Sequence, residues 1–187
     1  MKQIIRPMVI LGIICIVCGG LLGVVESVTR EPIRIQEEAT ATAGKQKVFA
    51  DAASFEEIKI SADENYDGIS VKTANIALDA SGETIGYVVE VLPSGFGGTI
   101  DLMVGVDMEG VVTGISILSL SESPGLGANA KEEWFQEQFV GVTAPVAVTK
   151  DGGQIEAITS STITSRAVSD GVTAAINWAA EYAGGAN

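Results

Sequence analysis

The residues with the clearest potential for chemistry form a run of hydroxyl side chains directly before a C-terminal helical segment. Six of the seven residues from Thr159 to Ser165 are Ser or Thr. Hydroxyl residues at the start of a helix cap free backbone N–H groups, which accounts for one such residue. A whole run, with its N–H groups, the helix dipole and the nearby Arg166, is also suited to holding a phosphate. The run therefore predicts either a helix cap or a phosphate-binding site.

Two glycine-rich loops are further candidates for ligand contact. One covers residues 121–127 (SESPGLG) and the other covers residues 95–98 (GFGG). Gly and Pro at this density are typical of tight loops in which the backbone can approach a ligand closely. Taken alone, the first loop is equally explained as a surface turn between a strand and a helix, and the second as a hairpin connection.

The chain lacks the side chains of most hydrolytic and redox sites. It contains no histidine, which excludes Ser-His-Asp and Cys-His nucleophiles, His-ligated zinc and an axial His ligand to haem. Its only cysteines, Cys15 and Cys18, lie inside an apolar segment, where a free thiol behaves as a small apolar side chain. We expect no metal site and no catalytic residue, so an organic cofactor must supply any redox chemistry.

The N-terminal segment is predicted to cross a membrane once. Pro7 to Val25 form an uncharged run of 19 residues, which as a helix is about 28 Å long, close to the ~30 Å core of a bilayer. Lys2 and Arg6 precede the run, so the N-terminus should lie in the cytoplasm and the rest outside. No small-x-small cleavage site closes the run, which favours a retained span in the cell (inner) membrane over a signal peptide.

The part of the chain after the apolar run is strongly acidic. All 24 acidic residues follow Val25, against 9 basic ones, and the net charge of the whole chain is -13. Binding to a phosphate backbone requires clustered Lys and Arg, so a nucleic-acid partner is excluded. A domain that lies flat on an anionic lipid surface is disfavoured for the same reason.

The predicted organisation is a cytoplasmic N-terminus, a span, a helical connector and an extracytoplasmic domain: residues 1–6, 7–25, 26–54 and 55–187. Apolar segments separated by turn residues predict the strands of an antiparallel meander at 75–78, 85–92, 99–106 and 111–118. Further elements are expected as helices at 129–138 and 165–183 and as a strand at 146–148. The fold class is therefore α+β, with helices packed against one side of the sheet and one transmembrane helix before it.

Taken together, these segments resemble one family. The chain looks like the G subunit of the Rnf complex, an ion-translocating ferredoxin:NAD oxidoreductase, and is similar to the C subunit of the sodium-pumping NADH:quinone reductase. The resemblance extends from residues 29–33 (TREPI) through both glycine-rich loops to the hydroxyl run. In that family the fourth residue of the motif S/T-G-A-T-x-T/S-S carries FMN through a phosphoester bond. That residue is Thr162, with Ser160 and Ser161 where the family usually has Gly and Ala.

The resemblance implies an electron-carrying subunit with covalent FMN, which is not a complete catalyst alone. Its partners would be the other Rnf membrane subunits and a flavin transferase that takes FMN from FAD with Mg²⁺. The residues implied in cofactor binding are Thr162 as the anchor, with Ser160, Ser161, Thr164, Glu122, Gly125, Leu126 and Gly127.

Other interpretations remain. The chain could be a component of the quinone reductase that resembles its C subunit, or a stand-alone membrane-anchored FMN-binding protein. It could equally be a membrane-anchored extracytoplasmic binding protein without flavin. It could also be a structural protein of the pilin type. Pilins need a Glu near the start of the apolar stretch, whereas Glu26 follows its end, which disfavours the pilin interpretation.

Overall fold

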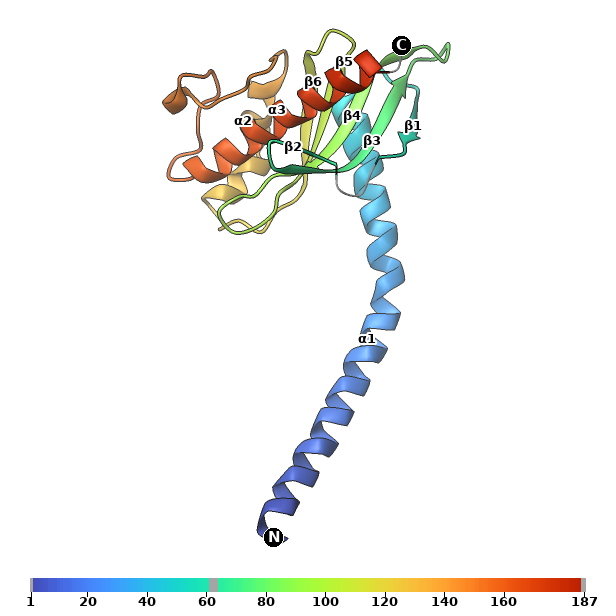
Figure 1. Cartoon of the computed structure of the whole chain (residues 1–187), viewed down its shortest axis with the longest axis vertical. Coiled ribbons are helices and arrows are strands. Elements are labelled where there is room, and N and C mark those ends of the chain that lie inside the picture. The colour runs from blue at the N-terminus through green and yellow to red at the C-terminus, as the bar shows by residue number, and fades with distance from the viewer. Residues whose placement is uncertain (1, 61–63, 186–187) are drawn as a thin grey trace. The chain divides into compact units, whose positions relative to one another are not determined.

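The computed structural model describes residues 2–60 and 64–185. It contains a long N-terminal helix, an antiparallel sheet and a long C-terminal helix (Figure 1). The chain divides into two compact units, residues 1–41 and 42–187, which are described separately.

Helix α1 extends from Lys2 to Val48. From Ile10 onward it is long and apolar enough to cross a membrane, with a mean hydropathy of 2.3 over an 18-residue window, and it is the one such helix in the described part of the chain. Beyond the apolar run, Arg30 and Arg34 form ion pairs with glutamates four residues away on the same helix. Such exposed pairs between residues four apart favour the helical conformation weakly. They help the helix to continue past its apolar segment.

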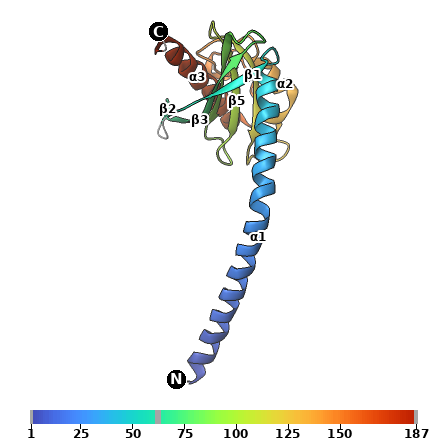
Figure 2. The same cartoon turned by 90° about the vertical axis from the view of Figure 1, so that its right-hand side faces the viewer.

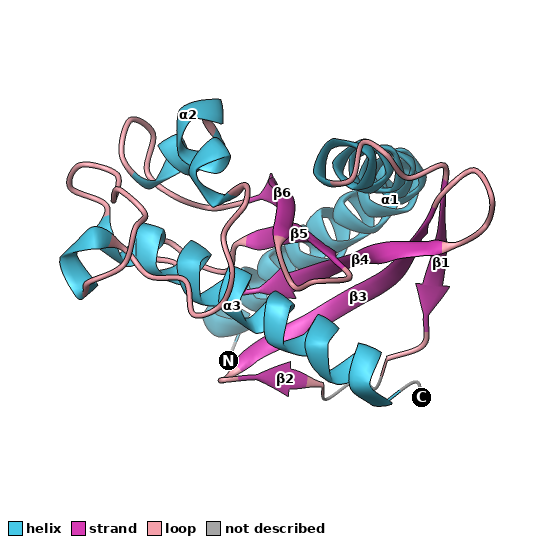
Figure 3. Ribbon diagram, turned by 90° about the horizontal axis from the view of Figure 1, so that it is seen from above, coloured by secondary structure: helices cyan, strands magenta, loops and turns pink. Residues whose placement is uncertain are grey.

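Six strands form one antiparallel sheet in the second unit. They are β1 (Ser54–Ile58), β2 (Asn65–Tyr66), β3 (Ile69–Leu78), β4 (Thr84–Leu92), β5 (Asp101–Asp107) and β6 (Val112–Ser119). The spatial order is β1-β3-β4-β5-β6, and β2 pairs with β3 (Figure 3). The predicted antiparallel meander is confirmed, and β1 and β2 are additions to it.

Two aspartate-containing turns fix the register of the meander. The carboxylate of Asp79 accepts backbone N–H groups from two residues of the β3–β4 turn, at 2.8 and 2.9 Å. Asp107 does the same in the β5–β6 turn, with both distances 2.9 Å. Each turn ends at a glycine with positive φ, 82° at Gly82 and 81° at Gly110. Asp and Gly at these positions are therefore the local cause of both hairpins.

Helices pack on both faces of the sheet. Leu102 and Met103 are neighbours in β5, so their side chains point to opposite faces. A Cβ added at Gly171 of helix α3 (Thr162–Gly185) would lie 2.9 Å from Leu102, and one added at Gly44 of α1 would lie 3.2 Å from the Met103 sulfur. The expectation that helices cover one side only is wrong, because the last turns of α1 cover the other side (Figure 2).

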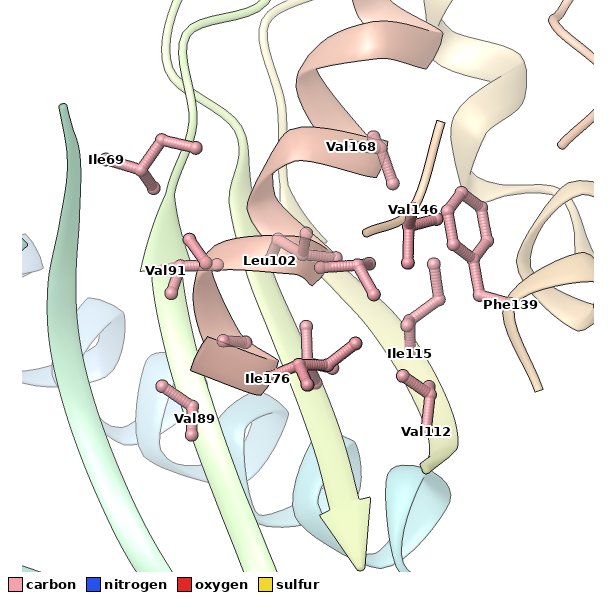
Figure 4. Packing of buried hydrophobic residues seen from close by; sticks show 14 of the residues in the cluster. Ile69, Val89, Val91, Leu102, Val112, Ile115, Phe139, Val146, Val168 and Ile176 are labelled. Carbon is pink, nitrogen blue, oxygen red and sulfur yellow. The ribbon is translucent and has the colours of Figure 1, made fainter. Parts of the chain in front are cut away.

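The main hydrophobic core lies between the sheet and α3 (Figure 4). Val168 and Ile176 of α3 are buried in one cluster with Val91 and Leu102 of the sheet. Positions 168 and 176 lie two helical turns apart, so one face of α3 supplies its contacts to this core. The helix that the sequence predicts over residues 165–183 is confirmed, and its apolar face packs on the sheet.

Between β6 and α3 the predicted elements are broken into shorter ones. The expected helix over residues 129–138 is three pieces: η1 (Gly127–Lys131), α2 (Glu133–Gln136) and η2 (Glu137–Phe139). Glu132 is extended, with φ −70° and ψ 142°, and this interrupts the helix. In place of a strand over residues 146–148, a single bridge joins Val148 to Ile155, and η3 (Thr149–Asp151) follows.

Three charged side chains form a cluster on adjacent strands of the sheet. The ammonium of Lys72 lies 2.7 Å from a carboxylate oxygen of Glu90 and 2.6 Å from one of Asp101. Burial, together with the adjacent Glu90 carboxylate, raises the pKa of Asp101 from 3.8 to about 6.

Removal of the Asp101 carboxyl should change how stability depends on pH. The folded domain holds this proton up to about pH 6, whereas the unfolded chain releases it near 3.8, so this carboxyl by itself lowers the free energy of unfolding across that interval as pH rises. The lowered pKa of Glu90 acts in the opposite direction. Asp101→Asn should therefore make the free energy of unfolding fall less, or rise more, with pH than in the wild type, measured by urea unfolding of the full chain in detergent with far-UV circular dichroism. Asp51→Asn, at an exposed position, is the control and should keep the wild-type pH dependence. An unchanged pH dependence in Asp101→Asn would contradict this assignment.

Candidate functional site

Helix α3 begins at Thr162, three residues earlier than the sequence predicts. The side chain of Thr162 is partly exposed, and its Oγ1 accepts a hydrogen bond from Nζ of Lys150 at 2.9 Å. Ser165 is fully buried; its hydroxyl accepts the N–H of Ile158 at 2.9 Å and donates to the carbonyl of Ser161 at 3.0 Å. Residues of the hydroxyl run therefore have different roles. Ser165 stabilises the start of the helix through its buried hydrogen bonds, whereas the side chain of Thr162 is accessible at the surface.

Ser160 adopts a left-handed backbone conformation, with φ of 62°. That conformation costs a residue with a Cβ about 1–2 kcal/mol, whereas glycine adopts it freely. Ser160 stands where the family motif usually has Gly. Its departure from the motif therefore falls at a position whose backbone favours glycine.

Ser160→Gly should raise the free energy of unfolding by about 0.5–1 kcal/mol. The backbone strain that glycine removes from the folded state is larger than the stability lost because glycine increases the conformational entropy of the unfolded chain. Urea unfolding of the full chain in detergent measures the change. Ser123→Gly is the matched control, because Ser123 has no positive φ, and it should lower stability or leave it unchanged. A decrease in stability for Ser160→Gly would contradict the prediction.

A cleft of about 400 Å³ opens beside Thr162. The residues that line it come from three separate segments: Phe96, Ser123, Leu126, Ser160, Ser161, Thr162, Ile163 and Thr164. These segments are the two glycine-rich loops and the hydroxyl run, so the structure brings all three predicted segments to one site. Its lining combines hydroxyl groups with three apolar side chains that are well exposed, Phe96, Leu126 and Ile163. Such a lining suits a ligand that has both an anionic group and an apolar ring.

Five of the eight residues predicted for the site line this cleft, namely Ser160, Ser161, Thr162, Thr164 and Leu126. Glu122, Gly125 and Gly127 are not among the lining residues. Glu122 connects the two glycine-rich loops, because its Oε1 accepts the N–H of Phe96 at 2.7 Å.

Gly127 allows the second loop to pack closely against the start of α3. A Cβ at this position would lie 2.7 Å from Oε2 of Glu122 and 2.7 Å from Oγ1 of Thr164. Both distances are shorter than a carbon–oxygen contact allows, so no larger residue fits without movement. Gly127 and Glu122 thus pack against Thr164, a residue that lines the cleft, without lining it themselves.

Sequence reasoning missed Lys150 and Asp151, which lie in η3. Arg166 was expected to add positive charge beside the hydroxyl run, but its Nε and Nη2 donate to the carboxylate of Asp151 at 2.6 and 2.7 Å. Hydrogen bonding to Arg166 lowers the pKa of Asp151 and keeps it ionised, so the two charges cancel. Lys150 is therefore the cation that meets Thr162. Across the described residues, no group of three or more Cys, Asp or Glu side chains is placed to hold a metal ion.

Comparison with known proteins gives two family matches. The family described as the FMN-binding domain matches residues 95–177, and the RnfG N-terminal region matches residues 1–43. Every residue that lines the cleft lies inside the first of these ranges.

Several curated proteins are similar over nearly the whole chain. The G subunit of the ion-translocating oxidoreductase complex of Methanosarcina acetivorans is 32% identical over 185 residues, which is 98% of this chain and 98% of that protein. The G subunit of the Na(+)-translocating ferredoxin:NAD(+) oxidoreductase complex of Acetobacterium woodii is 34% identical over 189 residues, covering 94% and 91%. The crystal structure of NqrC from Shewanella oneidensis matches 67% of this chain and 66% of its own, at 16% identity and a TM-score of 0.49.

Proposed function

Because the chain belongs to the family of G subunits of ion-translocating oxidoreductase complexes, we propose that it is an electron-carrying subunit with FMN bound covalently to Thr162. One observation carries the site assignment. Thr162 lines a cleft inside the FMN-binding-domain range, and its hydroxyl accepts a hydrogen bond from a lysine ammonium. The quinone-reductase interpretation is set aside, because the relatives that match nearly the whole chain are named as G subunits.

The residues at the cleft fit both halves of FMN. A phosphoryl group on Thr162 would lie at the N-terminus of a 24-residue helix, where the helix dipole and free N–H groups favour an anion. Phe96, Leu126 and Ile163 offer exposed apolar surface that suits an aromatic ring system. Bound FMN supplies the capacity to accept and pass electrons, and the protein supplies attachment, position and electrostatic environment.

Attachment requires a flavin transferase that uses FAD and Mg²⁺. Oγ1 of Thr162 would form a bond to the phosphorus of the FMN half of FAD. The anhydride bond to the AMP half breaks, AMP leaves with the bridging oxygen, and the hydroxyl proton is released. No oxidation or reduction takes place in this step, so FAD is the only co-substrate needed.

The proposal includes a topology and partners. Lys2 and Arg6 precede the apolar segment of α1, which favours a cytoplasmic N-terminus and an extracytoplasmic FMN-binding domain. The partners are the other subunits of the ion-translocating complex, as the names of the relatives indicate. A covalent bond suits a cofactor outside the membrane, because FMN lost there is not readily recovered.

The test is expression of the full chain with and without an active flavin transferase, followed by denaturing electrophoresis. We expect a band with flavin fluorescence only when the transferase is present, because a phosphoester survives denaturation. A second flavoprotein labelled by the same transferase shows that the enzyme is active. A chain that stays without flavin beside that control would overturn the proposal and favour a membrane-anchored binding protein without flavin.

A further inference from the structure

The turn η3 contacts the N-terminal part of α3 at two points. Lys150 donates to Oγ1 of Thr162 at 2.9 Å, and the next residue, Asp151, accepts two hydrogen bonds from Arg166 at 2.6 and 2.7 Å. Thr162 and Arg166 are four residues apart and lie on the same face of α3. Two successive residues of η3 therefore hold two successive turns of the helix.

We propose that Lys150 is the positioning residue for the acceptor hydroxyl, an inference that rests on the proposed attachment of FMN to Thr162. Lys150 fixes Oγ1 for phosphoester formation and supplies the positive charge that the phosphodiester needs. The Asp151–Arg166 pair secures the same turn against the helix and adds no net charge.

The backbone around Lys150 is held firmly enough for this role. The N–H of Thr149 donates to the carbonyl of Ile155 at 2.8 Å, and the N–H of Asp151 donates to the carbonyl of Val148 at 2.9 Å. Val148 itself is fully buried. Gly153 follows the turn, where a Cβ would lie 2.0 Å from the carbonyl oxygen of Ala147, so the chain passes that point closely. The lysine thus extends from a closed, anchored turn.

The hydrogen-bond direction suits an acceptor hydroxyl. Because an ammonium can only donate, Lys150 occupies a lone pair of Oγ1 and leaves the hydroxyl proton free to depart. The same ammonium stabilises negative charge as it develops on Oγ1. In the described chain Lys150 takes part in no ion pair, whereas Arg166 is paired with Asp151, so the Lys150 ammonium is the cation in direct contact with Oγ1. Its charge also acts on the adjacent Asp151 carboxylate.

In a purely structural role, the hydrogen bond of Lys150 would only help to hold η3 against α3, as the Asp151–Arg166 ion pair does. The two roles differ in what they demand of the side chain. A positioning role needs a cation that donates to Oγ1, which arginine can replace and methionine cannot. If the role is only structural, any substitution of Lys150 that lowers labelling should also lower the free energy of unfolding.

The experiment measures covalent flavin incorporation into the full chain in detergent, with purified transferase, FAD and Mg²⁺, over a series of acceptor-chain concentrations. Lys150→Met should lower the maximal labelling rate by roughly 10-fold to 100-fold, the effect of losing one charge-assisted hydrogen bond, with the KM for the chain unchanged. Lys150→Arg should restore most of that rate. Lys59→Met, which removes an exposed lysine from a different part of the domain, should label as the wild type does. Urea unfolding of each variant reports stability separately.

The outcomes are distinguishable. If the wild type is not labelled, the proposed attachment itself fails. If the wild type is labelled and Lys150→Met is labelled at the same rate, the attachment stands and the role of Lys150 is overturned. If Lys150→Met and Lys150→Arg lose labelling equally and both unfold at lower urea concentration, the role of the lysine is only structural and the inference is overturned as well.

Discussion

Thr162→Ala should abolish covalent flavin incorporation and leave the domain folded. The variant removes the hydroxyl of a residue that lines the cleft, begins α3 and accepts the Lys150 hydrogen bond. Thr162 is only partly buried, so the loss in stability should be small, about 1 kcal/mol for one hydrogen bond. Thr162→Ser keeps the hydroxyl and should keep a substantial part of the labelling.

The control for this prediction comes from the same hydroxyl run. Thr159 is exposed and is not among the residues that line the cleft, so Thr159→Ala should be labelled to the wild-type extent. In-gel flavin fluorescence, normalised to the amount of protein, measures labelling in all three variants. Persistent fluorescence in Thr162→Ala, or its loss in Thr159→Ala, would place the acceptor at another residue.

Trp178→Ala should lower the free energy of unfolding by about 3–5 kcal/mol, the usual loss when a large buried aromatic side chain is truncated. Trp178 is 2% exposed and lies on α3. Its ring stacks on Tyr182 with centroids 5.1 Å apart and meets Tyr87 edge-on at 6.4 Å. Its Nε1 also donates to Glu64, and this hydrogen bond disappears with the ring.

The loss of packing in Trp178→Ala should also affect the flavin site, because both lie on α3. The helix that Trp178 anchors begins at Thr162, so loss of its packing reduces the fraction of chains with an ordered acceptor. Trp134→Ala is the matched control, because Trp134 is 50% exposed, and its removal should change stability by less than about 1 kcal/mol. Far-UV circular dichroism during urea unfolding measures both variants. Equal effects of the two substitutions would contradict the packing described for α3.

The sheet could be predicted because its signals are local. Asp79 and Asp107 open turns that close on glycine, and the apolar segments on either side pair by the shortest possible connections. Strand β1 gave no such signal. Its residues belong to the predicted connector and the start of the predicted domain, and they become a strand only because they pair with β3, about twenty residues further along the chain. The last turns of α1 likewise find their place through tertiary contact, at a sheet face that no local pattern identifies.

The candidate site divides in the same way. The hydroxyl run and the glycine-rich loops have distinctive local compositions, and the structure brings them to one cleft. Ser160 could be identified as a departure from the family motif, and its φ of 62° gives that departure a physical meaning. Lys150 could not be found from sequence, because its contact with Thr162 depends on how η3 folds back on α3. The local sequence around a lysine in a polar loop does not show whether its side chain makes a tertiary contact or is exposed to solvent.

The most direct measurement is peptide mass spectrometry of the flavin-loaded chain. Cleavage after Lys150 and Arg166 releases one peptide, residues 151–166, that carries every hydroxyl of the run. Fragmentation of that peptide should place one FMN, linked by a phosphoester, on Thr162. An unmodified peptide from a sample treated with active transferase, or FMN on any other residue of the peptide, would contradict the account.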